Sequence, residues 1–336
     1  MTWLGHEAAE QAFLDAWNGG RMHHAWLLAG PKGLGKAAFA LRAARFLLAQ
    51  GTAATDAEDR TAKTLEGFDD SAASHLIDAG AHPEFKCLER LENEKTGSMA
   101  RSISVDQVRA ASALLTSTTS ISRYRAIIVD SADDLEAAGA NALLKSLEEP
   151  PANTVFFLVS HNSGRLLPTI RSRCRSLNFR AIGDDVMASW LRETMPDAGA
   201  DAIASLTALA GGAPARALRF RDSDLASVWR DLELLGERGD TDLSITTRLS
   251  QSLSLKGAND SYEAFLELAP TLLSRAARAA DGRAAALLVD RWREANRIAS
   301  SAVATSPDKA LTVFELCRLL THRSDMAALS NQFAAG

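Results

Sequence analysis

The sequence lacks a long apolar run, an excess of positive charge and a set of paired cysteines, and each shortage excludes a class of protein. No uninterrupted apolar run approaches the roughly 20 residues that a helix needs to cross a bilayer. The first residues, MTWLGHEAAEQAFLDAW, have neither the basic start nor the long apolar stretch of a signal peptide. We therefore expect a cytoplasmic protein with no membrane partner.

Cysteine is scarce, and the chain holds three of them at Cys87, Cys174 and Cys317. An odd number of widely spaced cysteines does not make a disulfide framework, so we interpret all three as thiols. His75 and His82 precede Cys87, but these three groups are scattered around a proline and do not have the spacing of a zinc site. We expect no zinc and no other bound metal.

Positive charge is also in short supply, because 42 acidic residues outnumber 37 lysines and arginines and give a net charge of -5. A protein whose main role is to grip DNA usually carries a basic surface. Several arginines lie between Arg275 and Arg297, but Asp281, Asp290 and Glu294 are interleaved with them, which favours a solvated helix face. A stand-alone DNA-binding module is therefore disfavoured.

The chain is long enough for two or three domains, since a domain usually holds roughly 100 to 200 residues. Up to about residue 180, apolar runs of strand length alternate with helical patterns, which predicts a parallel sheet flanked by helices. The predicted strands are HAWLLAG, RAIIVD, TVFFLVS and SLNFR. From Asp184 onward apolar residues recur at helical spacing. We predict an α/β domain over residues 1–179 and helical domains over 180–222 and 223–336.

A phosphate-binding loop follows the first predicted strand. The residues GPKGLGKA, Gly30 to Ala37, match G-x-x-x-x-G-K-[ST] at every position except the last. In such a loop the glycines (here Gly30, Gly33 and Gly35) let the backbone wrap around phosphates, and Lys36 supplies a point charge. Ala37 has no hydroxyl with which to hold Mg²⁺. The motif predicts a loop of phosphate-binding ancestry that is not equipped for hydrolysis.

A second part of the expected nucleotide site lies where RAIIVD ends. Asp130 occupies the position of a magnesium-binding acid, but Ser131 stands where a glutamate would polarise water. We attribute Asp133 and Asp134 to the dipole of a helix that they begin. Because ligands collect beyond the carboxyl ends of parallel strands, the loops after the strands at Leu28 and Val129 are expected neighbours. We expect a degenerate nucleotide site at which ATP binds weakly or not at all.

Two charged groups follow this region. Glu148 and Glu149 oppose the dipole at the C-terminal end of a predicted helix, so something other than helix propensity accounts for them. Three arginines then alternate in RSRCR just before a predicted strand, and for Arg171 and Arg175 we favour a solvated basic edge. Sequence alone does not explain the two glutamates.

The motifs GPKGLGKA, NALLKSLEEPP and SRC, in this order, resemble the bacterial DNA polymerase III clamp loader family. The similarity is close over the first predicted domain and weaker beyond it. The resemblance implies a P-loop AAA+ domain with a parallel sheet, then a small helical lid and an all-α collar. It also implies a hetero-pentamer with motor and delta subunits that loads a sliding clamp on primer-template DNA.

Three positions depart from the family's ATP-hydrolysing motor subunit. A hydroxyl is missing at Ala37, a glutamate is missing at Ser131, and Ala215 stands where the motor subunit has an arginine. Arg216 is one residue further on, roughly 100° around a helix, and should point elsewhere. We also expect no extended C-terminal region of the kind that the long motor form carries. With these departures the chain resembles the delta-prime branch of the family, which hydrolyses no ATP and requires no cofactor.

The resemblance assigns Arg173, in SRC, as an arginine finger that reaches the ATP site of a neighbouring subunit. An arginine supplied in trans is worth about 10³ to 10⁵ in rate at a phosphoryl-transfer site, although its owner hydrolyses nothing. The alternative is an active AAA+ ATPase, the motor subunit itself. Lys36 and Asp130 keep this alternative open, whereas Ala37 and Ser131 argue against it.

Overall fold

The computed structural model describes residues 5–52, 61–92, 99–116, 118–221, 225–255, 257–305 and 308–333. They form two compact units. The first contains the chain up to Met187 together with Gly212–Ala215, and the second contains Ala188–Gly211 and the chain from Arg216 onward. The predicted lid–collar boundary at residues 222 and 223 lies outside the described residues, and the three-domain division stays a prediction.

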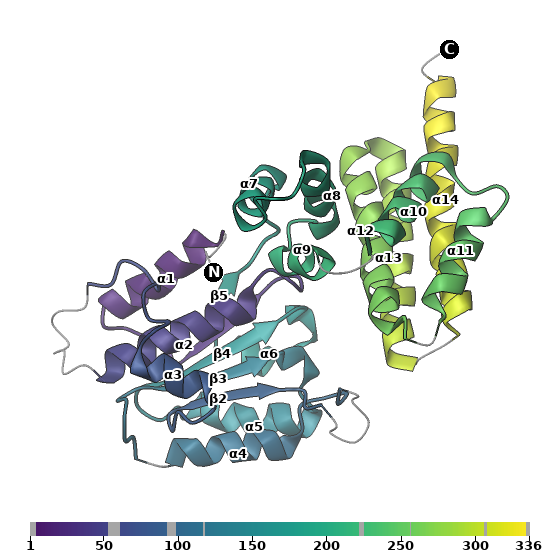
Figure 1. Cartoon of the computed structure of the whole chain (residues 1–336). Helices are drawn as coiled ribbons and strands as arrows, with labels where there is room; N and C mark the ends of the chain where they lie inside the picture. Colours follow the sequence, from purple (N-terminus) through teal and green to yellow (C-terminus); the bar gives the residue numbers. More distant parts are fainter. Residues whose placement is uncertain are drawn as a thin grey trace. The chain divides into compact units, whose positions relative to one another are not determined.

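A parallel sheet lies at the centre of the first unit (Figure 1). Its strands are β1 (Ala25–Ala29), β2 (Phe85–Glu89), β3 (Arg125–Asp130), β4 (Thr154–Ser160) and β5 (Arg175–Asn178). The four predicted strands all form, and β2, which alternates less clearly in burial, is an addition. Every residue of β1 and β4 is buried, as expected for strands covered on both faces. The predicted α/β fold is confirmed.

The strand order is β2-β3-β4-β1-β5. β4 pairs with β1 on one side, with Phe156 opposite Ala25, and with β3 on the other, with Phe156 opposite Ile127. The loops after β1 and β3 therefore emerge at the same edge, as expected, with the end of β4 between their strands. Charges of the two loops interact there, since Asp130 and Asp133 act on the Lys36 pKa. The residues after Ser160 join the same edge.

Helices cover both faces of the sheet, with α1, α2 and α3 on one face and α4 and α5 on the other (Figure 1). The helices and 3₁₀ turns of this unit are α1 (Glu7–Asn18), α2 (Lys36–Thr52), α3 (Ala72–Asp78), α4 (Val105–Thr116), η2 (Ala132–Asp134), α5 (Ala137–Glu148), η3 (Ser163–Arg165) and α6 (Pro168–Arg171). α5 buries Leu143 and Leu147 and ends just before Pro150, whose ring cannot continue a helix.

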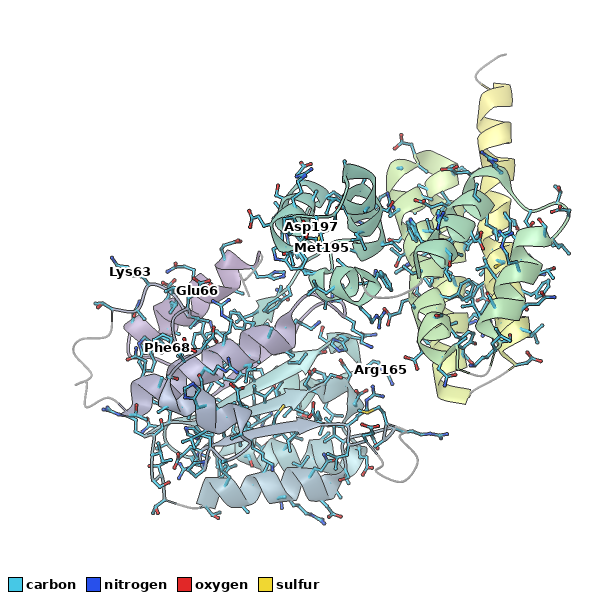
Figure 2. The ribbon with its side chains drawn as sticks, in the orientation of Figure 1. Lys63, Glu66, Phe68, Arg165, Met195 and Asp197 are labelled. Atoms are coloured by element: carbon cyan, nitrogen blue, oxygen red, sulfur yellow. The ribbon has the colours of Figure 1, made fainter. Side chains whose placement is uncertain are left out.

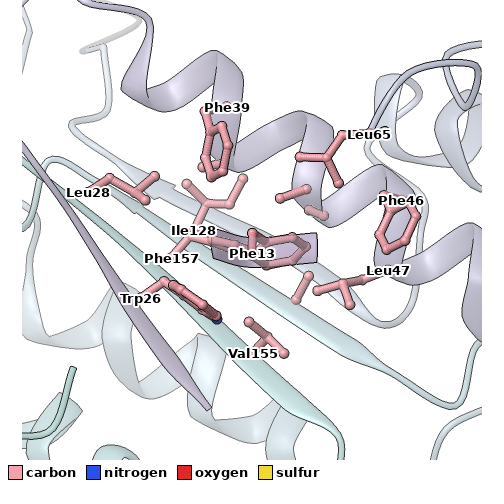
Figure 3. Close-up of a cluster of buried hydrophobic side chains, with 14 of the residues drawn as sticks. Phe13, Trp26, Leu28, Phe39, Phe46, Leu47, Leu65, Ile128, Val155 and Phe157 are labelled. Atoms are coloured by element: carbon pink, nitrogen blue, oxygen red, sulfur yellow. The ribbon is translucent and has the colours of Figure 1, made fainter. Parts of the chain in front are cut away.

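An aromatic cluster fixes α1 and α2 on the sheet (Figure 3). The Phe13 ring lies 5.3 Å from Trp26 and 5.9 Å from Phe157, centroid to centroid, and 6.4 Å from Phe46 of α2. Phe13 is fully buried, and such burial contributes about 1.5–3 kcal/mol for a side chain of this size. The loop between β1 and α2 is thus anchored at both ends by the same core.

The segment before α3 lies against this core. Its described part begins at residue 61, and the Leu65 N–H donates to Glu10 Oε1 of α1 at 2.7 Å. Glu66 pairs with Arg42 of α2 at 3.4 Å, and Phe68 packs edge-on against Phe46 at 5.2 Å (Figure 2 labels Glu66 and Phe68). This segment therefore folds onto α1 and α2, and residues 53–60 lie outside the described part.

The chain beyond β5 is helical throughout its described part. Its helices are α7 (Asp184–Thr194), α8 (Ala200–Ala210), α9 (Pro214–Arg221), α10 (Leu225–Arg238), α11 (Ser244–Leu253), α12 (Asn259–Ala279), α13 (Gly282–Thr305) and α14 (Lys309–Phe333). Their core includes fully buried Trp229, Phe265 and Leu316. Among the described helices we find none with the length and hydropathy to span a membrane.

Candidate functional site

The predicted phosphate loop joins β1 to α2 at the carboxyl edge of the sheet. Gly30, Gly33 and Gly35 have positive φ angles of 151°, 85° and 83°. At Gly30 a side chain is excluded, because a Cβ atom there would overlap the carbonyl oxygen of Phe179. The glycines of the motif thus meet a steric requirement as well as a conformational one.

Lys36 is the first residue of α2 and is almost completely buried. Its ammonium group donates to the carbonyl oxygens of Gly30 and Pro31, each at 2.5 Å. Burial lowers the Lys36 pKa to about 8, and the negative charges of Asp130 and Asp133 oppose that shift. The lysine is therefore held by carbonyls of its own loop.

Asp130 ends β3 and is electrostatically coupled to Lys36. Burial raises the Asp130 pKa, the charge of Glu89 adds to the rise, and Lys36 opposes it. Ser131, in the position of the missing glutamate, is buried, and its hydroxyl donates to Asp134 Oδ2 at 3.1 Å. The edge thus brings together a cation and a carboxylate, but Ser131 supplies no basic group.

Asp133 and Asp134 do not begin a helix, so the explanation from the helix dipole is wrong. Ala132–Asp134 is a 3₁₀ turn, and α5 starts at Ala137. Asp133 instead accepts hydrogen bonds from Ser160 Oγ at 2.9 Å and from the His161 N–H. The Asp133 carboxylate ties the end of β3 to the end of β4, which explains an acid at this position.

His161 belongs to this site and was not predicted from the sequence. It follows the last residue of β4, and within the described residues its Nδ1 is buried without a hydrogen-bond partner. Burial lowers the His161 pKa to about 4, and Lys36 adds to the shift. The imidazole is therefore neutral at physiological pH. The sequence signal that could have revealed His161 was the predicted strand TVFFLVS. The carboxyl end of this parallel strand reaches the same edge of the sheet as the phosphate loop.

Ala215 and Arg216 lie at the start of α9 and have different neighbours. The Ala215 N–H donates to the Gly33 carbonyl at 3.2 Å, so this position lies at the phosphate loop and presents only a methyl group. The Arg216 guanidinium is 3.2 Å from Thr271 Oγ1 and 3.9 Å from Glu267, both on α12. Burial lowers the Arg216 pKa, and Glu267 opposes that shift. Arg216 thus has partners of its own within the second unit.

Arg173 lies at the opposite edge of the sheet from the phosphate loop. It precedes β5, whose Arg175 pairs with Trp26 near the start of β1, whereas the loop follows Ala29 at the end of β1. The length of β1, about 13 Å at 3.3 Å per residue, separates the two edges. The structure does not bring Arg173 together with Lys36 or Asp130.

Glu148 is the partner of Arg173. Arg173 Nη2 lies 2.7 Å from Glu148 Oε1, and Nη1 donates to the Thr169 carbonyl at 2.9 Å. The ion pair links the end of α5 to the segment before β5. It supplies the explanation for Glu148 that the sequence did not.

The three cysteines and the candidate metal ligands are distributed over the first and second units. Cys87 is exposed on β2, Cys317 is buried, and all three cysteines are free thiols. His82 is buried with its Nδ1 3.6 Å from Glu84 Oε2. In the described residues no three metal-ligating side chains gather in one place. The absence of a metal cofactor stays a prediction.

Residues 5–183 match the model of the family described as "DNA polymerase III, delta subunit". The DNA polymerase III subunit delta' of Pseudomonas aeruginosa is 38% identical over 212 residues, 63% of this chain and 60% of that protein. The Escherichia coli subunit delta' is 30% identical over 214 residues, 64% and 59% of the two chains. The gamma/tau subunit of Mycobacterium tuberculosis is 31% identical over 261 residues, 76% of this chain and 40% of that one.

Among solved structures, a DNA polymerase III gamma subunit-related protein from Thermotoga maritima superposes with a TM-score of 0.44 at 15% identity, covering 93% of this chain and 99% of that one. The matches to the two delta' proteins span about 60% of those relatives' length. The family match, by contrast, takes in just over half of this chain, including the phosphate loop, Asp130 and Arg173. The chain therefore belongs to the DNA polymerase III delta-prime family of clamp loader subunits.

Proposed function

We propose that this chain is a non-hydrolysing, cytoplasmic delta-prime subunit of a clamp loader. It assembles with motor and delta subunits in a hetero-pentamer that loads a sliding clamp on primed DNA, and it donates Arg173 in trans to a neighbour's ATP site. The observation that carries this proposal is the position of Arg173 at the sheet edge opposite the chain's own phosphate loop. An arginine so placed lies away from the nucleotide site of its own chain, which supports a role in trans.

The composition of the chain's own site supports the absence of hydrolysis. Ala37 offers no hydroxyl for Mg²⁺, and the Ser131 hydroxyl is a poor base that is already engaged with Asp134. At Ala215 a methyl group occupies the position next to Gly33 where the motor subunit has an arginine. Three separate contributions to hydrolysis are therefore missing at one edge.

The same edge retains part of a phosphate site. The loop backbone at Gly30, Gly33 and Gly35 with Lys36 fits phosphate oxygens, and Asp130 fits a cation, but Lys36 is engaged by two loop carbonyls. A bound nucleotide would compete with these carbonyls for the ammonium group. We expect ATP to bind weakly or not at all and not to be required.

The second candidate is an active AAA+ motor subunit. The electrostatic coupling between Lys36 and Asp130 favours it, because a competent site needs both groups close together. It requires that other groups replace the missing hydroxyl and base.

Steady-state ATP turnover tests the proposal. The purified chain is measured alone, and then with motor and delta subunits, clamp and primed DNA. We expect no turnover from the chain alone and DNA-stimulated turnover once the chain completes the complex. Magnesium-dependent turnover by the chain alone would contradict the proposal and support the motor subunit.

A further inference from the structure

Glu148 and Arg173 form an ion pair between two segments of the chain that meet at the amino edge of the sheet. The pair joins Glu148 Oε1 to Arg173 Nη2 at 2.7 Å. A second contact, from Nη1 to the Thr169 carbonyl at 2.9 Å, holds the other arm of the guanidinium. Nη1 and Nη2 are thus bonded to different groups, which fixes both the position and the plane of the guanidinium.

Glu148 occupies a position that a helix disfavours. It is the last residue of α5, where a negative charge opposes the helix dipole, and the side chain is exposed. The helix itself therefore gains nothing from this carboxylate. The contact that Glu148 makes with Arg173 is a reason for the carboxylate to be there.

The neighbouring arginines are held differently. Arg171 donates to the Ser163 carbonyl, and the Arg175 guanidinium lies 5.0 Å from the centroid of the Trp26 ring. A carboxylate holds Arg173. A guanidinium has five N–H donors. Among the residues that the structure describes, the two contacts engage one donor on each of two nitrogens, which leaves three donors for phosphate oxygens. The Arg173 side chain is 34% exposed and accessible to a partner.

We propose that Glu148 is a positioning residue that holds the Arg173 guanidinium in the orientation in which it meets the neighbour's ATP. This inference rests on the proposed function, because it requires that Arg173 acts in trans. The carboxylate touches no reacting group. It restricts the rotamers of a long side chain before the subunits meet, so less conformational entropy is lost when the phosphate contact forms.

The expected effect of removing Glu148 is modest. An exposed ion pair contributes little, so E148A should lower the DNA-stimulated kcat of the assembled complex by about two- to fivefold, with KM for ATP unchanged. E148Q retains an oxygen that accepts a hydrogen bond from Arg173, and it should recover part of the lost turnover. E149Q is the matched control, since it neutralises the adjacent exposed glutamate and should leave turnover at the wild-type value.

The double mutant E148A/R173A separates positioning from other roles of Glu148. If Glu148 acts through Arg173, the double mutant turns over ATP at the rate of R173A alone, because there is no guanidinium left to orient. If Glu148 touches the neighbouring subunit directly, the two losses multiply. Size-exclusion chromatography of each complex establishes that the pentamer is intact before rates are compared.

The outcomes distinguish this inference from the function on which it rests. If R173A leaves turnover unchanged, the donation of Arg173 in trans is wrong. If R173A lowers turnover, two results would overturn the positioning role alone. One is an E148A complex that turns over ATP at or above the wild-type rate. The other is a double mutant in which the loss of E148A multiplies with that of R173A. A loss in E148A that disappears in the R173A background, with partial recovery in E148Q, supports the positioning role.

Discussion

Each of the two edges of the parallel sheet carries a basic side chain, but the two side chains differ in burial and in the groups that hold them. At the carboxyl edge Lys36 is buried and bonded to the carbonyls of its own loop, and the hydroxyl and base that hydrolysis needs are absent. At the amino edge Arg173 is partly exposed and held by Glu148. The carboxyl edge lacks groups that hydrolysis needs, and the amino edge presents an arginine held by two acceptors. This difference supports the proposal that the chain contributes to hydrolysis from its amino edge.

The largest expected effect is that of R173A at the amino edge. If Arg173 acts in trans as proposed, removing its guanidinium takes away the partner of the developing charge on the neighbour's phosphates, and hydrolysis at that site should fall by about 10³- to 10⁵-fold. R173K should restore little, since an ammonium lacks the bidentate fork. The measurement is single-turnover ATP hydrolysis by the assembled complex with primed DNA. An R173A complex with wild-type rates would remove the distinction between the edges.

The next effect concerns the core that both edges share. F13A should reduce the free energy of unfolding of the first unit by about 3–5 kcal/mol, because it opens a cavity among Trp26, Phe46 and Phe157. Denaturant unfolding followed by tryptophan fluorescence measures the loss. Since both edges depend on this core, the variant should also assemble poorly. A loss below about 1 kcal/mol would mean that the cluster relaxes to fill the space.

A smaller effect is expected from His161 at the carboxyl edge. Its pKa is about 4 when folded and about 6.5 when exposed, so the unfolded chain binds the extra proton first as the pH falls. Stability is therefore lost from about pH 6.5 down to pH 4, and is fully present above pH 6.5. Allowing for partial solvent screening, His161 should account for about 2 kcal/mol. Unfolding of wild type and H161N compared at pH 7 and pH 4.5 tests this, since H161N should show the shallower pH dependence.

The smallest expected effect is that of K36A on the assembled complex. If this chain's loop does not support turnover, removing its lysine should leave DNA-stimulated hydrolysis within about twofold of wild type, because the hydrogen bonds of Lys36 among the described residues go to its own loop. The matched measurement on R173A provides the contrast. A loss in K36A as large as that in R173A would show that the carboxyl edge is active.

Much of the composition of the carboxyl edge could be predicted from the sequence. The phosphate loop motif, the missing hydroxyl at Ala37 and the serine at Ser131 are all properties of residue type at a fixed spacing, and the loop indeed joins a strand to a helix. The error at Asp133 has a physical cause. An acid before an apolar helical run has the pattern of a helix start, and the hydrogen bond to Ser160 that explains it comes from a strand 27 residues further on.

The amino edge was less accessible from the sequence. The SRC motif identified Arg173 as a candidate functional residue. No local sequence pattern linked Arg173 to Glu148, which lies on another element. β2 was missed because its outward residues are exposed and its alternation is weak, so pairing with β3 decides its conformation. Local patterns contain no information on which distant segments pair.

Residue types along the chain decide which chemistry each position can perform, since an alanine has no hydroxyl and a serine no carboxylate in any fold. They also decide β1, β3, β4 and β5 and the long helices, because buried apolar periodicity is a local property. Tertiary structure alone decides that β4 separates β1 from β3, that Glu148 pairs with Arg173, and that Arg173 lies a strand's length from the loop of its own chain. Those facts depend on strand order and on contacts between distant segments, which local sequence patterns do not specify.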